Sequence, residues 1–433
     1  MRKQVSYSIT NTEKFKNALL NWSQQFHEIV WLDSNAHSNK YSSFDGLLAV
    51  DALTVKQTDA YSAFDDLKEY QQETKDWIFG YLSYDLKNDV ERLSSSNFDG
   101  LNFPELYFFQ PKKIISIQDD VLNFNYLNMV DDEIEEDYQD ILEKLNEEDA
   151  IVTSENPIRI RMRIFKDEYF RQVEQMLAHI QRGDIYEANL CQEFYIEEAE
   201  INACHTFKKL NEISKAPFAT FMRLNDGYLL SASPERYIKK EGVKIISQPI
   251  KGTIKRSLDP QEDQELKKAL ASDEKERAEN IMIVDLVRND LSKSAVKSSV
   301  VVEELCEIYS YDQVHQMVST ITAEVEAHKN PVDIIRETFP MGSMTGAPKV
   351  SAMKIIESLE SFKRGLYSGA VGYFTPDGDF DFNVVIRSIL YNASKKYVSY
   401  SVGGAITAKS IPEKEYEECL LKAKAMRQVL EHN

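Results

Sequence analysis

The spacing of apolar positions divides the chain into helical and extended stretches. Between Phe15 and Phe26 an apolar residue recurs every three or four positions, which predicts an amphipathic helix that faces a core. Similar spacing predicts helices over 167–183, 273–291 and 349–359 and a last helix that begins at Pro412. Runs rich in β-branched and aromatic residues predict strands over 5–9, 27–32, 46–55, 77–84, 185–195, 228–233, 244–248, 300–302, 308–311, 371–374, 380–390, 398–402 and 404–408.

These strands occur in groups with helices between the groups, which is typical of an α+β fold with large antiparallel sheets faced by helices. Residues 131–150 contain eleven acidic residues and one lysine, with apolar residues at helical intervals, and so predict an acidic amphipathic helix with a solvated face. Residues 151–157 have the composition of a turn or linker. We therefore expect an N-terminal region over 1–150 and a larger region over 160–430.

The composition narrows the class of protein. A chain of 433 residues with 42% apolar and 28% charged residues is typical of a globular protein. The net charge of -20 disfavours nucleic acid and anionic membranes as partners, although a local site can still bind a small anion. No apolar run reaches the roughly 18 residues of a membrane span, and the N-terminus lacks a signal-peptide core. The cysteines have neither metal nor redox-pair spacing, which indicates reduced thiols and a cytoplasmic location: Cys191, Cys204, Cys306 and Cys419.

Five short motifs follow one another along the second region. They are SPER at 233–236, PIKGT at 249–253, KERAEN at 275–280 running into DLVRND at 285–290, GSMTGAPK at 342–349 and GGAI at 403–406. Together they resemble the chorismate-utilising enzymes, which include the component I subunits of anthranilate and aminodeoxychorismate synthases and the isochorismate and salicylate synthases. The resemblance is strong over 165–426 and weak before it. It implies two antiparallel sheets packed as a sandwich with helices outside.

Lys251 lies between Pro249, which fixes the direction of the chain, and Gly252, which frees it. A lysine in this setting is either a solvated turn residue or a nucleophile whose neutral amine adds to an electrophilic carbon. The resemblance favours the nucleophile. The aminodeoxychorismate synthases carry lysine at this position, whereas the anthranilate synthases carry alanine.

Acidic residues recur at three-residue spacing on two predicted helices, as Glu276 with Glu279 and as Glu415 with Glu418. Such spacing places each pair on one helical face, where solvated ion pairs are the ordinary interpretation. The resemblance instead implies a Mg2+ ion held between the two helices, with Glu279 and Glu418 as direct ligands. Glu276 and Glu415 would then bind it indirectly or through water, and Lys422 would meet a carboxylate of the substrate.

The remaining site residues are also implied by the resemblance. Glu235 matches a general acid that protonates the departing ring hydroxyl, and an ion pair with Arg236 is its alternative. Residues 32–34 lie where feedback-regulated relatives form part of a tryptophan pocket, although a plain strand end is the favoured interpretation. Matches to substrate-binding positions fall on Arg387, Gly404, Thr345 and His315.

One position departs from the family pattern. Glu187 stands where amine-forming relatives usually carry glutamine and isochorismate-forming relatives carry a lysine that activates water. A carboxylate there would either orient ammonia or ammonium, or act as a base for water. The missing lysine argues against isochorismate chemistry.

The resemblance therefore implies amination of chorismate to 4-amino-4-deoxychorismate, a precursor of 4-aminobenzoate and folate. Lys251 would add to C2 while Glu235 protonates the C4 hydroxyl, and ammonia would then enter at C4 and expel the lysine. No cysteine here has the sequence pattern of a glutamine-hydrolysing nucleophile, so we expect a separate glutamine amidotransferase to supply the ammonia. The alternatives are formation of anthranilate and, more remotely, a regulatory subunit that binds chorismate without catalysis.

Overall fold

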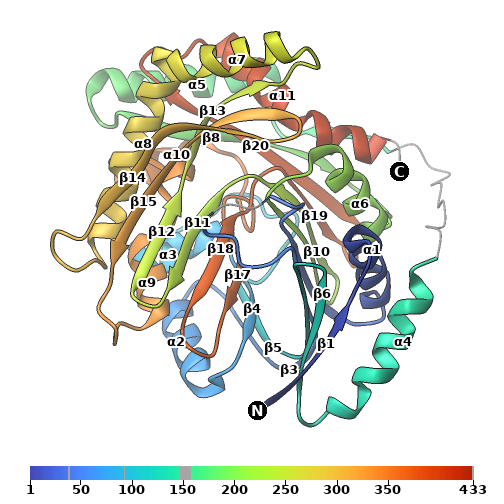
Figure 1. The fold of residues 1–433 in the computed structure, drawn as a ribbon. Helices are drawn as coiled ribbons and strands as arrows, with labels where there is room; N and C mark the ends of the chain where they lie inside the picture. The colour runs from blue at the N-terminus through green and yellow to red at the C-terminus, as the bar shows by residue number, and fades with distance from the viewer. Residues whose placement is uncertain (38–39, 92, 147–157, 432–433) are drawn as a thin grey trace.

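The computed structural model describes residues 1–37, 40–91, 93–146 and 158–431, and every pairing between its named strands is antiparallel (Figure 1). One row of neighbouring strands begins with β14 (Val301–Ser310), β15 (Val314–Glu324), β12 (Lys244–Gln248), β11 (Arg236–Glu241), β18 (Phe380–Val384), β17 (Ala370–Phe374), β4 (Ile78–Leu82) and β5 (Leu106–Gln118). It continues through β3 (Gly46–Thr58), β2 (Glu28–Asp33), β9 (Phe218–Leu224), β10 (Gly227–Ser233), β19 (Ser388–Asn392), β20 (Tyr397–Thr407) and β8 (Glu187–Ile196).

Short strands extend this row at several points. β13 (Ile250–Lys255) pairs with β15, β6 (Val121–Leu127) with β5, and β1 (Arg2–Ser8) with β6, whereas β7 (Arg161–Met162) and β16 (Gly346–Ala347) both pair with β8. The row folds back on itself, so that its two halves face each other (Figure 1). As a result β13, near one end, and β8, at the other, both contribute to one cavity. The predicted α+β class with packed antiparallel sheets is confirmed.

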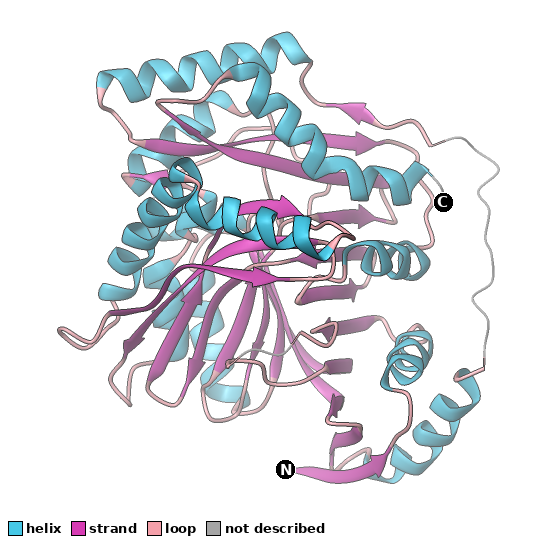
Figure 2. Ribbon diagram, turned by 45° about the horizontal axis from the view of Figure 1, so that its top comes forward, coloured by secondary structure: helices cyan, strands magenta, loops and turns pink. Residues whose placement is uncertain are grey.

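Helices lie around the strands (Figure 2). They are α1 (Thr12–Ser23), α2 (Ala63–Thr74), α3 (Lys87–Glu91), α4 (Ile134–Lys144), α5 (Lys166–Arg182), α6 (Ala203–Ser214), α7 (Pro260–Ser272), α8 (Glu274–Ser292), α9 (Pro331–Thr338), α10 (Lys349–Leu359) and α11 (Pro412–Glu431), with 3-10 turns at Tyr84–Leu86, Asp131–Glu133 and Gly342–Met344. One apolar core packs α1, α5, α6, α10 and α11 against the β8 and β20 side. A second core joins both halves of the row with α2, α8 and α9.

The two predicted regions contribute neighbouring strands to the same sheet. β4 pairs with β17, and β2 pairs with β9, so each of these pairings joins a strand before residue 150 to one after residue 160. The predicted linker at 151–157 lies outside the described residues. Of the predicted acidic helix over 131–150, the structure shows α4, which carries its solvated acidic face as expected. None of the helices in the described residues is long and apolar enough to cross a membrane.

Several predicted elements have different limits in the structure. Helix α1 ends at Ser23, and Phe26 lies beyond it, where its ring meets the edge of Trp22 at a centroid distance of 5.0 Å. The runs 300–302 and 308–311 belong to one strand, β14, because two irregularities in its register interrupt the alternation that marks a strand. In the same way, 398–402 and 404–408 form the single strand β20.

The predicted strand over 380–390 is broken in two, and the break positions a candidate site residue. β18 pairs with β11 and β17 in one half of the row, whereas β19 pairs with β10 and β20 in the other half. The chain therefore crosses between the halves at 385–387. Arg387 adopts a left-handed conformation there, with φ of 53°, which is a strained geometry that often marks functional sites.

Candidate active site

A cavity of about 520 Å³ opens between the two ends of the row of strands. β13 and α8 line one side of it, and β20, the start of β8 and α11 line the other. Its volume lies in the range of small-molecule sites, roughly 300–1,000 Å³. Eight of the predicted site residues line the cavity: Glu235, Lys251, Glu276, Glu279, Arg387, Glu415, Glu418 and Lys422.

Lys251 reaches this cavity from an irregularity in strand pairing. The register between β13 and β15 shifts between Ile250 and Thr253, which places Lys251 and Gly252 on a bulge. Gly252 has φ of 98°, and a Cβ there would lie 3.2 Å from a carboxylate oxygen of Glu276. The glycine therefore permits both the left-handed backbone and the close approach of α8.

Asn280 fixes the position of α8 relative to Lys251. Its side-chain amide donates to the backbone carbonyls of Lys251 and Met317, each at 3.3 Å. The same side chain accepts a hydrogen bond from the Ser319 hydroxyl at 2.5 Å. In this position α8 places a carboxylate oxygen of Glu279 3.7 Å from Nζ of Lys251, whose side chain is 22% exposed.

The two glutamate-bearing helices face each other across the cavity. Asp273 begins α8 by accepting hydrogen bonds from two backbone N–H groups of the first turn, and α11 begins at Pro412 as predicted. Burial and then Glu279 raise the pKa of Glu276. Burial also raises the pKa of Glu415, and Glu418 and Glu279 act in the same direction. The carboxylates therefore lie close enough to repel one another, and a cation between them would be favourable.

Lysines contact these carboxylates directly. Nζ of Lys422 lies 2.7 Å from Glu418 and donates to the Gly403 carbonyl at 2.7 Å. Burial acts to raise the pKa of Glu418, but the contact with Lys422, together with neighbouring lysines, outweighs burial and lowers that pKa. Lys275 lies 3.6 Å from Glu279. Burial lowers the pKa of Lys275, but the surrounding carboxylates raise it by more. The predicted role of Lys422 toward a substrate carboxylate stays a prediction.

The carboxylates that line the cavity fit a Mg2+ ion whose shell is completed by waters and substrate oxygens. Within the described ranges, no three His, Cys, Asp or Glu side chains converge tightly enough to hold a metal by themselves. Mg2+ commonly binds one or two carboxylates and completes its shell with waters and substrate oxygens. One glutamate from each helix beside a cavity is compatible with that pattern, and Glu276 and Glu415 line the same cavity.

Glu235 occupies the short connection between β10 and β11 and is almost fully buried. Burial raises its pKa to about 7, while a hydrogen bond with Ser343 and the charge of Lys251 act in the opposite direction. Its backbone is held by a bond from Val384 N–H to its carbonyl at 3.0 Å. The neighbouring Arg236 turns away and pairs with Asp381 at 3.0 Å, so the alternative ion pair within this motif does not form. A carboxyl group in this state can donate a proton near neutral pH.

Arg387 lines the cavity. In the part of the chain that the structure describes, no protein group makes a hydrogen bond or ion pair with its guanidinium. Burial lowers its pKa, and Tyr367 and Glu418 act in the opposite direction. A planar donor without a protein partner is well suited to bind a carboxylate in forked geometry.

Three predicted residues have other surroundings. The Thr345 hydroxyl donates to the Gly342 carbonyl at 3.1 Å, within its own loop. His315 is buried outside the cavity, where its ring nitrogens meet Ser310 at 2.9 Å and Asp263 at 3.1 Å, so its placement differs from the predicted substrate contact. Gly404 faces α11, and a Cβ there would lie 3.5 Å from Glu415.

The structure also places residues that sequence reasoning missed. Gln316, the neighbour of His315, lines the cavity, and its side-chain oxygen is buried without a hydrogen-bond partner among the described residues. Adjacent residues of a strand point to opposite faces, so only one of the two can reach the site. Asn189, Ser343 and Met344 line the cavity as well. Ser343 and Met344 belong to the GSMTGAPK motif, which is the sequence signal from which their place in the site could have been predicted.

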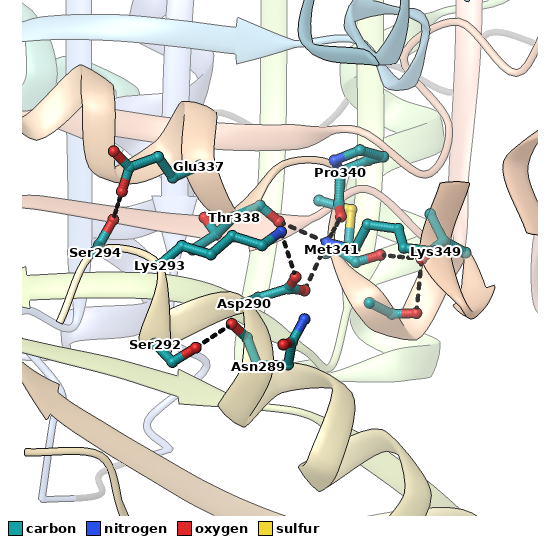
Figure 3. A network of polar contacts seen from close by, with 12 residues as sticks. Asn289, Asp290, Ser292, Lys293, Ser294, Glu337, Thr338, Pro340, Met341 and Lys349 are labelled. Atoms are coloured by element: carbon teal, nitrogen blue, oxygen red, sulfur yellow. Dashed lines mark hydrogen bonds and ion pairs between the residues drawn. The ribbon is translucent and has the colours of Figure 1, made fainter. Parts of the chain in front are cut away.

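A buried ion pair holds the loop that carries Ser343. Nζ of Lys349 lies 2.6 Å from Asp290 of α8 and donates to the carbonyls of Thr338 and Pro340 at 3.0 and 2.8 Å (Figure 3). Burial lowers the pKa of Lys349, and Asp290 opposes this. The ammonium thus joins α8, which bears two cavity glutamates, to the loop on the facing side.

A second, smaller cavity of about 50 Å³ lies at the end of β2. Leu32, Asp33 and Ser34 line it. The Asp33 carboxylate accepts hydrogen bonds from Lys16 and from the Asn35 N–H, both at 2.8 Å. These contacts suit a strand end, and a tryptophan site here stays untested.

The fold and the larger cavity are compatible with a binding site for a small molecule. The family model described as chorismate binding enzyme matches residues 18–428, and the chain belongs to that family. A crystal structure of anthranilate synthase component I from Streptococcus pneumoniae has the same fold, with a TM-score of 0.76 and 24% identity, and the match covers 90% of this chain and 94% of that one.

Sequence relatives carry more specific names. Aminodeoxychorismate synthase component 1 of Salmonella typhimurium is 42% identical over 265 residues, which cover 61% of this chain and 58% of that protein. A probable chloroplastic aminodeoxychorismate synthase of Oryza sativa is 42% identical over 285 residues, which cover 65% of this chain and 32% of that protein. The match with this chain thus spans less than two thirds of the length of either relative.

Proposed function

We propose that this protein aminates chorismate at C4, using ammonia, to form 4-amino-4-deoxychorismate. The observation that carries the proposal is Lys251, which projects from its bulge into the same cavity as the buried acid Glu235. The aminodeoxychorismate synthase names of the relatives from Salmonella typhimurium and Oryza sativa support it.

In the first step, the neutral amine of Lys251 forms a bond to C2 of chorismate, and the ring double bonds shift from C1–C2 and C5–C6 to C1–C6 and C4–C5. The C4–O bond breaks, and Glu235 supplies the proton with which the hydroxyl leaves as water. The pKa of about 7 at Glu235 keeps a large fraction of the acid protonated at neutral pH. Arg387, which has no protein partner in the described ranges, would hold a substrate carboxylate.

In the second step, ammonia forms a bond to C4 as the C2–Nζ bond to Lys251 breaks, and the ring double bonds return to C1–C2 and C5–C6. Lys251 leaves as a neutral amine, ready for another cycle. The enolpyruvyl group stays on the ring. This distinguishes the proposed reaction from formation of anthranilate, in which pyruvate is eliminated.

Mg2+ would bind between Glu279 and Glu418, with Glu276 and Glu415 beside it, and when bound it would withdraw charge from the substrate carboxylate and from Glu279. Glu279 lies 3.7 Å from Lys251 in the structure, so the ion would bind beside the amine that reacts. We further propose that a separate glutamine amidotransferase supplies the ammonia in the cell, in keeping with the component 1 name of the relative from Salmonella typhimurium.

Mass-resolved chromatography of the products formed from chorismate, Mg2+ and ammonium tests this function. We expect 4-amino-4-deoxychorismate, which becomes 4-aminobenzoate only after a separate aminodeoxychorismate lyase is added. Anthranilate as the product would contradict the proposal and favour the anthranilate synthase alternative. Isochorismate or salicylate would show that water, and not ammonia, is the nucleophile.

A further inference from the structure

Glu187 is a buried carboxylate without a partner. Its side chain is 1% exposed, and neither of its carboxylate oxygens has a hydrogen-bond partner among the described residues. Burying an isolated carboxylate is strongly unfavourable, and the great majority of buried polar groups are therefore hydrogen-bonded. A cation or hydrogen-bond donor that binds the Glu187 carboxylate would explain this exception.

The backbone of Glu187 is fixed on both sides. It lies opposite Thr407 of β20 and opposite Ala347 of β16. Gly346 packs so closely that a Cβ there would lie 2.2 Å from the Glu187 carbonyl oxygen. The backbone that carries this side chain is therefore held by two neighbouring strands.

The alternation of β8 shows which way the side chain points. Ala188 and Leu190 are fully buried in the apolar core that packs against α5 and α11. Asn189, on the opposite face of the strand, lines the active-site cavity. Glu187 shares a face with Asn189, because residues two apart on a strand point to the same side. Its carboxylate is thus directed toward the cavity side of the sheet.

Electrostatics place Glu187 near the reacting groups. Burial raises its pKa, Lys251 acts in the opposite direction, and Glu279 adds to the rise. The carboxylate therefore interacts with the lysine that would carry the substrate. The anionic substrate cannot supply a compensating charge, since its carboxylates would be repelled. A small cation with several N–H donors could supply both the charge and the hydrogen bonds.

We propose that Glu187 binds the ammonium ion and converts it to the ammonia that attacks C4. This inference rests on the proposed function. Ammonium would donate hydrogen bonds to the Glu187 carboxylate and then transfer one proton to it. The lone pair of the resulting ammonia forms the C4–N bond as the C2–Nζ bond of the protonated Lys251 adduct breaks. The product leaves with a charged amino group, and Glu187 returns its proton to water.

Kinetics with ammonium as the nitrogen source test the role, with wild type compared to Glu187→Leu, which cannot accept a hydrogen bond. Loss of a hydrogen bond to a charged group should raise the KM for ammonium about tenfold or more. The KM for chorismate should stay unchanged. Without ammonium, the variant should still form the Lys251 adduct, seen as a gain in protein mass of one chorismate less one water. Its melting temperature should not fall, since no protein partner is lost.

Glu193 offers a matched control on the same face of β8. It is also buried, but its carboxylate accepts hydrogen bonds from Arg163 at 2.8 Å, Tyr397 at 3.1 Å and Ser399 at 2.7 Å. Glu193→Gln should lower the melting temperature and leave the KM for ammonium unchanged. The two variants therefore separate a structural carboxylate from one that serves the nucleophile.

The outcomes also separate this inference from the proposed function. If wild type forms aminodeoxychorismate and Glu187→Leu keeps the KM for ammonium, the inference is wrong and the function stands. A rise in the KM for chorismate alone would assign Glu187 to the substrate and overturn the ammonium role. Isochorismate made by wild type and lost in the variant would make Glu187 a base for water. If wild type forms no aminated product, the proposed function fails, and the inference fails with it.

Discussion

Replacing Lys349 with methionine removes the buried cation that joins α8 to the loop before α10. Its ammonium contacts Asp290, Thr338 and Pro340 at 2.6, 3.0 and 2.8 Å, and the Lys349 and Asp290 side chains are only 8% and 5% exposed. Removing one partner of a buried ion pair costs about 3–5 kcal/mol, because the remaining charge stays buried. We expect Lys349→Met to lower the free energy of unfolding by about that amount.

Lys293 provides a matched control, since it contacts the other carboxylate oxygen of Asp290 at 3.2 Å from a side chain that is 41% exposed. An exposed pair contributes about 0–1 kcal/mol, so Lys293→Met should cost no more than that. Urea unfolding followed by circular dichroism measures both variants. Equal losses of stability in the two variants would refute the argument that burial makes the Lys349 contact the stronger one.

The remaining predictions concern the cavity. Because burial raises the pKa of Glu235 to about 7 and the acid must be protonated to act, kcat/KM for chorismate should fall as pH rises above about 7, and Glu235→Gln should lose most activity at every pH. A flat profile across this range would argue against the acid role. Arg387→Lys should raise the KM for chorismate about tenfold or more, since a fork of donors to a carboxylate is lost, and an unchanged KM would remove Arg387 from the site. Glu279→Gln and Glu418→Gln should each raise the Mg2+ concentration needed for half-maximal activity more than Glu276→Gln does, and the reverse order in a Mg2+ titration would exchange the direct and indirect ligands.

Local signals made the helices of the site predictable. Gly183 ends α5 in a left-handed conformation, and Asp273 caps α8, each where the sequence indicates. The three-residue spacing of glutamates likewise placed each pair on one face of its helix. What the spacing could not show is that α8 and α11 face each other, because this depends on how the row of strands folds back.

Other features depend on register and on long-range pairing. The stretch 380–390 is rich in apolar residues, yet the chain changes sheet halves at 385–387, and no glycine or proline marks that crossing. His315 and Gln316 are neighbours on one strand, and a shift of one residue decides which of them reaches the cavity. The contact of Lys349 with Asp290 joins residues 59 positions apart and follows from tertiary packing alone.

The central claim is that Lys251 bonds covalently to chorismate, and intact-protein mass spectrometry tests it most directly. Wild type and Lys251→Ala would each be incubated with chorismate and Mg2+ in the absence of ammonium. The account predicts that wild type alone gains the mass of one chorismate less one water, that peptide mapping places the gain on Lys251, and that added ammonium removes it. Formation of aminodeoxychorismate by Lys251→Ala at the wild-type rate, with no adduct in either protein, would contradict the account.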